Sequence, residues 1–215
     1  VFANLIKFIT WILPTNAGQG LVIIVAVMAA QPLPVLPVQA LWINMTTAVL
    51  LGLALAFEPR EPGIMRRPPR PPNAPILSGE LIFRILLVGL LLLIGGFGLF
   101  EWALYRGASE AEARTIAVNV FAVGQSFYLL NCRSLRFSMF RLGLFSNPWI
   151  WAGIAAMIAA QLLFTYLPVM NWLFHTAPIG WMDWLHIVLV GLVIYLVIGA
   201  EKAWRLRREA GDRET

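Results

Sequence analysis

The segment Pro14-Thr-Asn-Ala-Gly-Gln-Gly20 places three side-chain amides or hydroxyls inside an apolar run that is long enough to cross a membrane. The next apolar run contains a second polar break, Asn44-Met-Thr-Thr47. Unpaired polar side chains cost several kcal/mol in hydrocarbon. Membrane chains that keep them at mid-depth use them to line a pathway or to hold helices together. Both functions require a helical membrane fold around the two breaks.

The composition identifies an integral membrane protein. The 215 residues are 60% hydrophobic and 13% charged, and the mean hydropathy of +0.77 is far too high for a soluble domain of this length. A helix needs about 20 residues to cross the hydrocarbon layer. We therefore expect an all-α fold, a polytopic membrane helix bundle of six transmembrane helices at 3–30, 36–57, 80–104, 114–132, 148–168 and 182–203.

The basic residues are distributed by side of the membrane. They gather between spans two and three, between spans four and five and after span six, whereas the alternate loops hold only Arg106, with Arg114 at a helix edge. By the positive-inside rule the three basic segments and both ends of the chain are cytoplasmic. This topology accounts for the net charge of +5 without a nucleic-acid partner. The clustered residues are Arg60, Arg66, Arg67, Arg70, Arg133, Arg136, Arg141, Lys202, Arg205, Arg207, Arg208 and Arg213.

The first polar break is predicted to disturb its helix. Pro14 has no amide proton to donate to the carbonyl of Thr10, and Gly18 and Gly20 follow closely. We expect a kink or a loosened turn at this point. Carbonyl oxygens freed in this way are tolerated at membrane depth only inside protein or beside a hydrated cavity.

The two polar breaks are predicted to lie in one helical hairpin. Asn16 and Gln19 are three residues apart, which places them on one helical face beside the freed carbonyls. The short proline-rich turn 31–37 makes spans one and two antiparallel neighbours. Asn44 and Thr47 can then meet the polar groups of span one if one helix is tilted or unwound.

Polar residues of the later spans give a weaker signal. Span four carries Asn119, Gln125 and Ser126, and Gln125 lies near mid-membrane, where an interhelical hydrogen bond and a ligand role are equally supported. The polar residues of spans five and six show no cluster and are interpreted as scaffold: Gln161, Thr165, His186 and Tyr195.

Several kinds of catalytic site are excluded by the sequence. It contains no Gly-rich phosphate loop, no catalytic triad and no Cys or His pair with metal-ligand spacing. The single cysteine, Cys132, is interpreted as a packing residue. Every Asp and Glu lies outside the spans or at their ends, so the predicted membrane site is neutral.

Four motifs around the second span resemble a known family. They are Leu41-Trp-Ile-Asn-Met-Thr-Thr47, Ala56-Phe-Glu-Pro59, Ile64-Met-Arg-Arg-Pro-Pro-Arg70 and Leu77-Ser-Gly79. The chain resembles the C-terminal membrane region of type II P-type cation-transporting ATPases, which include calcium and sodium/potassium pumps and bacterial relatives. The resemblance covers essentially the whole chain, from the fifth to the tenth span of that family.

The resemblance implies a set of metal ligands. The ligands of the family's fifth span fall on Asn16 and Gln19, those of its sixth span on Asn44, Thr47 and Ala48, and that of its eighth span on Gln125. Calcium pumps of the family have Glu, Asp and Glu where this chain has Gln19, Ala48 and Gln125. All three carboxylates are therefore missing from this half of the site.

The missing carboxylates bear on the identity of the ion. Calcium binds six to eight oxygens, usually including carboxylates that offset its charge, whereas amide, hydroxyl and carbonyl oxygens replace hydration without neutralising charge. We interpret the site as suited to a monovalent cation or to single-ion transport. The alternative is a calcium-transporting ATPase that uses an acid of the family's fourth span, which lies outside this chain.

Two further alternatives remain open at this point. Six spans with a broken hairpin also suit a secondary transporter or channel. A structural or regulatory membrane protein, whose amides only hold helices together, is the other. A phosphorylation motif encoded upstream of Val1 distinguishes the pump from both.

The resemblance also implies an organisation and partners. We expect a helix hairpin with ion-site residues at 1–57, a cytoplasmic Pro/Arg-rich loop at 58–79, a four-helix supporting region at 80–204 and a basic cytoplasmic tail at 205–215. ATP and magnesium belong to the full-length pump, an ion-translocating enzyme, and none is bound by this chain itself. The expected partners are the transported inorganic cation, the lipid bilayer and the remaining domains of the same pump, in a bacterial plasma membrane. Because the sequence starts at Val1 without a signal or initiator Met, it is predicted to be cut from a longer chain.

Overall fold

The computed structural model describes residues 2–59, 78–134, 143 and 145–211. All regular structure in these residues is helical, as predicted. Most of the predicted 58–79 loop and the end of the predicted tail lie outside the described residues. The elements are α1 (Phe2–Met28), α2 (Pro37–Thr47), the π-helical turn η1 (Ala48–Gly52), α3 (Leu53–Ala56), α4 (Gly79–Tyr105), α5 (Glu110–Cys132), α7 (Pro148–Tyr166), α8 (Pro168–Phe174) and α9 (Trp181–Gly211).

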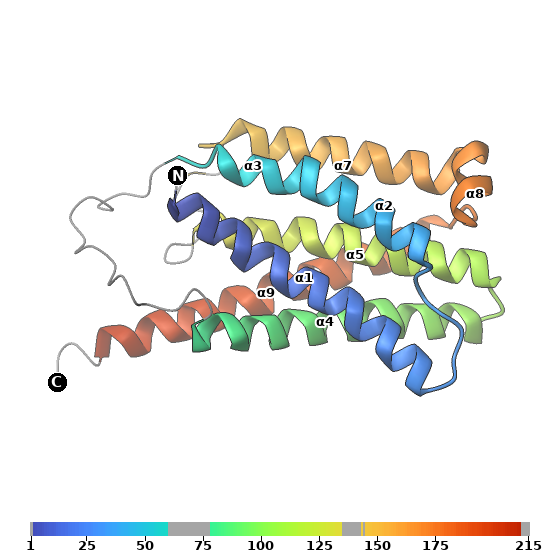
Figure 1. Cartoon of the computed structure of the whole chain (residues 1–215), viewed down its shortest axis with the longest axis horizontal. Helices are drawn as coiled ribbons and strands as arrows, with labels where there is room; N and C mark the ends of the chain where they lie inside the picture. Colours follow the sequence, from blue (N-terminus) through green and yellow to red (C-terminus); the bar gives the residue numbers. More distant parts are fainter. Residues whose placement is uncertain (1, 60–77, 135–142, 144, 212–215) are drawn as a thin grey trace.

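Six helical segments are long and apolar enough to span a membrane, and they coincide with the six predicted spans. The second span, Pro37–Ala56, consists of α2, η1 and α3 in direct succession. The N- and C-termini lie at the same end of the bundle (Figure 1), as an even number of spans requires. We call this end cytoplasmic, following the distribution of the basic residues.

Local sequence signals place several helix starts. The hydroxyl of Ser78 accepts a hydrogen bond from the amide of Leu81 at 3.3 Å and caps α4. Ser109 and Glu112 form a reciprocal capping box at the start of α5. Proline begins α2, α7 and α8, where its missing amide proton is not needed.

The central element is α5. In the apolar stretch of α5 that would cross the membrane, 78% of the residues are buried in the bundle. In the corresponding stretches of the other spans the share is 28% to 44%. It packs against α9, α4, α1, α2 and α7 (Figure 1). A helix surrounded in this way needs no polar face toward solvent, so the polar side chains that it carries must be explained by contacts within the bundle.

Glycines bring the first, third and fourth spans close together. A methyl group added at Gly18 would lie 2.9 Å from Cβ of Leu92 and 3.4 Å from the α-carbon of Gly89. A methyl group added at Gly96 would lie 3.0 Å from the ring of Phe121. Small residues at Gly89 and Gly96 of the third span therefore allow close packing of neighbouring helices, while Gly98 has no atom within 4 Å of an added methyl group.

The predicted loosening of span one is wrong. α1 is a continuous helix of 27 residues with Pro14 buried inside it. The carbonyl of Thr10, which Pro14 cannot satisfy, accepts a hydrogen bond of 2.8 Å from the hydroxyl of Tyr128 in α5. Because a neighbouring helix supplies the missing donor, the proline causes no break.

The irregular backbone occurs in the second span. At η1 the amide of Leu53 bonds to the carbonyl of Ala48, five residues earlier, which widens the turn. Two glycines accommodate this turn. A methyl group at Gly52 would lie 2.7 Å from the ring of Phe8, and one at Gly153 of α7 would overlap the carbonyl oxygen of Leu50. η1 is therefore held between α1 and α7.

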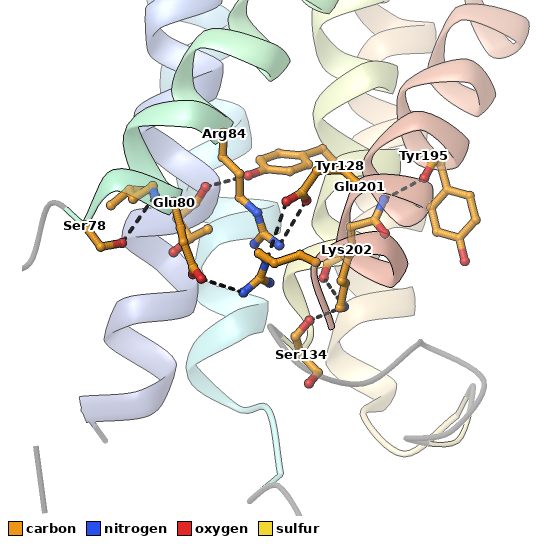
Figure 2. A network of polar contacts seen from close by, with 12 residues as sticks. Ser78, Glu80, Arg84, Tyr128, Ser134, Tyr195, Glu201 and Lys202 are labelled. Atoms are coloured by element: carbon orange, nitrogen blue, oxygen red, sulfur yellow. Dashed lines mark hydrogen bonds and ion pairs between the residues drawn. The ribbon is translucent and has the colours of Figure 1, made fainter. Parts of the chain in front are cut away.

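A polar network joins the cytoplasmic ends of α4, α5 and α9 (Figure 2). Arg84 and Glu201 form a largely buried ion pair at 3.4 Å, and Arg205 pairs with Glu80 at 3.0 Å. The ammonium group of Lys202 donates to the carbonyls of Asn131 and Ser134. The C-terminal end of α5 carries a partial negative charge from the helix dipole. The positive charge of Lys202 interacts favourably with it, so this contact stabilises the junction.

Candidate functional site

The predicted ligands divide into a buried and an exposed set. Gln19, Thr47 and Gln125 are 5%, 2% and 1% exposed, respectively. Asn16 and Asn44 are exposed. The predicted shared face of Asn16 and Gln19 is therefore only partly right, because the two side chains lie on either side of the boundary between the bundle interior and its surface. Asn44 and Thr47, also three residues apart, divide in the same way.

The amide nitrogens of the two buried glutamines have no partner in the part of the chain that the structure describes. Nε2 of Gln19 and Nε2 of Gln125 are both buried and make no hydrogen bond with the described residues. Thr47 donates its hydroxyl proton to the carbonyl of Ile43 at 2.7 Å, which leaves its oxygen free to accept or to coordinate. The interhelical hydrogen bond considered for the side chain of Gln125 is not formed with any described residue.

Two hydrogen bonds fix α1 against α5 beside Gln125. The indole nitrogen of Trp11 donates to the main-chain carbonyl of Gln125 at 3.0 Å, and Tyr128 donates to Thr10. The carbonyl that Pro14 leaves free therefore has a hydrogen-bond donor from α5.

Leu92 of α4 lies close to the residues that precede both buried glutamines: methyl groups added at Gly18 and at Gly124 would each lie 2.9 Å from its side chain. No hydrogen bond within the described part of the chain joins Gln19, Thr47 or Gln125 to one another.

A cavity of about 350 Å³ opens between the first half of α1 and the second half of span two. Ala48, the position where calcium pumps of the resembling family have Asp, lies in its wall, so there is room there for a longer side chain. No carboxylate lines this cavity. The lining residues are Asn4, Leu5, Phe8, Ala48, Gly52, Leu53 and Ala56.

The candidate site is uncharged. Among the described residues no group of three His, Cys, Asp or Glu side chains is placed to hold a metal ion. The available donors are amide, hydroxyl and main-chain oxygens, which replace part of a cation's hydration without cancelling its charge.

A buried ion pair that the sequence did not indicate lies at the end of the second span, just after α3. Glu58, two residues after α3, binds Arg133 at 3.1 Å, and both side chains are 1% exposed or less. Nδ2 of Asn147, before α7, donates to the same carboxylate at 2.8 Å. Asn4 of α1 donates to the carbonyl of Glu58 at 2.9 Å. The motif Ala56-Phe-Glu-Pro59 contained the signal, but the partners are 75 and 89 residues away.

Thr165, which the sequence analysis interprets as scaffold, makes an interhelical hydrogen bond that the sequence did not indicate. Nδ2 of Asn119 in α5 donates to Oγ1 of Thr165 in α7 at 3.0 Å, and both residues are fully buried. A polar contact therefore joins the fourth and fifth spans at a depth where the sequence showed only isolated residues.

Comparison with protein families places the chain. The profile described as "Cation transporting ATPase, C-terminus" matches residues 32–204. The chain belongs to this family. Membership confirms the predicted resemblance to the C-terminal membrane region of P-type ATPases, and with the six spans it identifies an integral protein of the plasma membrane.

Relatives of this cation-transporting ATPase region carry corresponding names. "Probable cation-transporting ATPase F" of Mycobacterium tuberculosis (strain ATCC 25618 / H37Rv) is 54% identical over 94% of this chain and 22% of its own length. "Cation-transporting ATPase pma1" of Synechocystis is 40% identical over 86% of this chain and 21% of its own length. "Calcium-transporting ATPase" of Bacillus subtilis is 30% identical over 87% of this chain and 21% of its own length. The chain thus spans about a fifth of the curated relatives that it matches.

Proposed function

We propose that this chain is the membrane transport part of an ATP-driven cation pump and supplies part of its cation path. The observation that carries the proposal is the burial of three predicted ligands, Gln19, Thr47 and Gln125, inside a chain of the cation-transporting ATPase family. The side-chain oxygens of these residues are the atoms that would coordinate a cation. Asn16 and Asn44 are proposed as the other ligands.

The exposed ligands imply that the site is completed by other segments. Asn16 and Asn44 lie at mid-span on the bundle surface, where contact with lipid would leave their amides unpaired. We infer that further membrane segments of the same pump cover this face. ATP hydrolysis, with magnesium, is assigned to the parts of the pump outside this chain.

The neutral donor set favours a monovalent cation or transport of a single ion. Three neutral residues, Gln19, Ala48 and Gln125, occupy the positions where the resembling calcium pumps have acids. Without those charges the cost of dehydrating a divalent cation is poorly offset. A monovalent cation needs less compensation and is served by amide and hydroxyl oxygens.

Calcium transport is the second candidate. Relatives that are 30% and 28% identical are named calcium-transporting ATPases. A calcium pump of this kind would depend on carboxylates from segments outside this chain. A secondary transporter or channel is disfavoured by membership of the ATPase family.

The organisation expected from the sequence remains part of the proposal. Residues 1–57 carry the ligands, 58–79 connect the second span to the cytoplasmic parts, 80–204 support the site and 205–215 form the basic tail. The buried contacts of Glu58 agree with a fixed starting point for the connecting segment.

The decisive experiment measures ion dependence in the full-length pump. Phosphorylation by ATP and ion flux into vesicles are compared in sodium, potassium and calcium. We expect stimulation by a monovalent cation, and substitution of Gln19, Asn44 or Gln125 by Ala weakens it. Ser126→Ala is the matched control, because its hydroxyl donates to the carbonyl of Ala122 in its own helix and holds no other span. Calcium uptake with ATPase stimulation at micromolar calcium would reject the monovalent assignment.

The cavity beside Ala48 allows a sharper test of charge. Ala48→Asp introduces a carboxylate where there is room for it, and Ala48→Asn introduces the same shape without the charge. We expect only the Asp variant to shift the ion preference toward divalent cations. Equal behaviour of the two variants would show that charge at this position does not set selectivity.

A further inference from the structure

Four buried polar atoms without protein partners lie outside the candidate cation path. They are Nε1 of Trp42, Oδ1 of Asn119, and both Nε2 and Oε1 of Gln161. The three residues come from α2, α5 and α7, and the side chains of Asn119 and Gln161 are 0% and 2% exposed. None of the three is among the predicted ligands.

Two contacts place Asn119 and Trp42 beside the turns of α7 that carry Gln161. Asn119 donates to Thr165 at 3.0 Å, and Thr165 lies one helical turn after Gln161 on the same face. The ring of Trp42 stacks on Phe164, with centroids 5.6 Å apart and planes 15° apart, and Phe164 is three residues after Gln161. The second and fourth spans thus both meet the fifth span beside Gln161.

The unsatisfied atoms include both donors and acceptors. Trp42 offers one N–H group and the Gln161 amide nitrogen offers two, while Asn119 and Gln161 each offer one carbonyl oxygen. A bound cation would satisfy only the two oxygens and would repel the N–H groups. A water molecule accepts two hydrogen bonds and donates two, and buried waters typically make about three bonds to such groups.

We propose that Trp42, Asn119 and Gln161 form an internal water-binding site between α2, α5 and α7. The site is separate from the candidate cation ligands: it contains unpaired oxygens, on Asn119 and Gln161, together with unpaired N–H groups, whereas the unpaired atoms of Gln19 and Gln125 are nitrogens alone. The inference does not depend on which ion, if any, the full-length protein transports.

A series of hydrogen-bonded polar groups extends from this site to the outer end of the bundle. The amide of Asn119 also bonds to the carbonyl of Thr115 at 2.9 Å, and the hydroxyl of Thr115 accepts the amide proton of Ala177 at 3.0 Å. Ala177 lies between α8 and α9, at the end opposite the termini. Nearby, Asn171 binds the hydroxyl of Thr176 at 2.8 Å. These hydrogen bonds link Asn119 to the segment between α8 and α9 at the outer end of the bundle.

Substitution of Gln161 by Met tests the site, because Met keeps the shape and removes both polar atoms. If water bridges the cluster, Gln161→Met leaves Trp42 and Asn119 with fewer partners, and the apparent Tm of the full-length pump in lipid nanodiscs falls. If the cluster is dry, the same change removes an unsatisfied amide and the Tm rises. A rise, or no change, overturns the proposal.

Two further measurements distinguish a bound water from a bound cation and from direct contact between the amides. A high-resolution density map of the parent pump is expected to show an ordered peak within hydrogen-bond distance of Gln161 and Asn119. A map in which these amides bond directly to each other contradicts the proposal. A cation at this site would instead make the Tm shift of Gln161→Met depend on the transported ion, which also contradicts it. Ser126→Ala is expected to leave the Tm unchanged.

Discussion

Polar side chains are buried to a similar extent at the cytoplasmic end of the second span and in the middle of the membrane. They differ in whether a neighbouring residue forms a hydrogen bond or an ion pair with them. Glu58 is 6% exposed and is bound by Arg133 and Asn147. Gln19 and Gln125 are 5% and 1% exposed, and their amide nitrogens have no partner in the described residues.

The difference follows from the cost of burial. An unpaired buried charge costs several kcal/mol, so a stable chain provides it with a partner of opposite charge and further hydrogen bonds. A neutral amide is cheaper to leave unpaired and can stay available for a ligand. Paired charges therefore mark the fixed part of this bundle, and unpaired amides mark the part that is open to a ligand.

The largest predicted effect breaks the fixed part. Arg133→Met leaves Glu58 buried without its charge partner, and we expect it to destabilise the full-length pump by about 3–5 kcal/mol. Thermal unfolding in nanodiscs measures the loss. The double variant Glu58→Gln with Arg133→Met removes both charges and should recover most of the stability. If the single variant is as stable as the parent, the ion pair does not hold this end together.

The next effect concerns the wide turn between the two regions. Gly153→Ala places a methyl group against the backbone carbonyl of Leu50, which cannot move like a side chain, and should cost about 3 kcal/mol. Gly98→Ala is the matched control in a membrane helix, because nothing lies within 4 Å of the added methyl group. Equal stability of the two variants would show that η1 tolerates movement away from α7.

A smaller effect is expected where α5 supports the proline of α1. Tyr128→Phe removes the donor to the carbonyl of Thr10 and should lower stability by about 1–2 kcal/mol. Tyr195→Phe serves as the control, since the Tyr195 hydroxyl has no partner in the described residues and points away from the network in Figure 2. The comparison of Tm values for the two variants isolates the hydrogen bond from the loss of a hydroxyl.

The smallest effect is predicted at the edge of the network in Figure 2. The side chain of Glu80 is 57% exposed in its pair with Arg205, so Glu80→Gln should change stability by less than about 0.5 kcal/mol. The small difference should vanish in high salt, which screens exposed charges. A loss as large as that of Arg133→Met would mean that exposed and buried ion pairs stabilise this bundle equally.

Features that depend on local sequence were predictable. The six spans followed from hydropathy and length. The ligand positions came from motif resemblance. The sequence did not separate the exposed Asn16 from the buried Gln19. The first span is apolar on nearly every face, so its hydrophobic pattern does not show which face packs against the other helices.

Features that depend on distant partners were not predictable. The partner of the carbonyl freed by Pro14 is Tyr128, 118 residues from Thr10. The contact of Asn119 with Thr165 and that of Glu58 with Arg133 likewise join different spans. Each depends on which helix faces lie together, and a single sequence does not contain that information. The π-helical turn at Ala48 also depends on close packing of its own Gly52 against Phe8 of α1 and of Gly153 of α7 against Leu50.

The continuity of α1 has a mechanical consequence. Its 27 residues form a rod about 40 Å long, which exceeds the roughly 30 Å of hydrocarbon that it crosses. A rod without a hinge transmits an axial push or a tilt along its whole length. A displacement applied near Phe2 therefore reaches Gln19 undiminished, and the proline that interrupts the hydrogen-bond ladder is bridged by a hydroxyl from the adjacent helix.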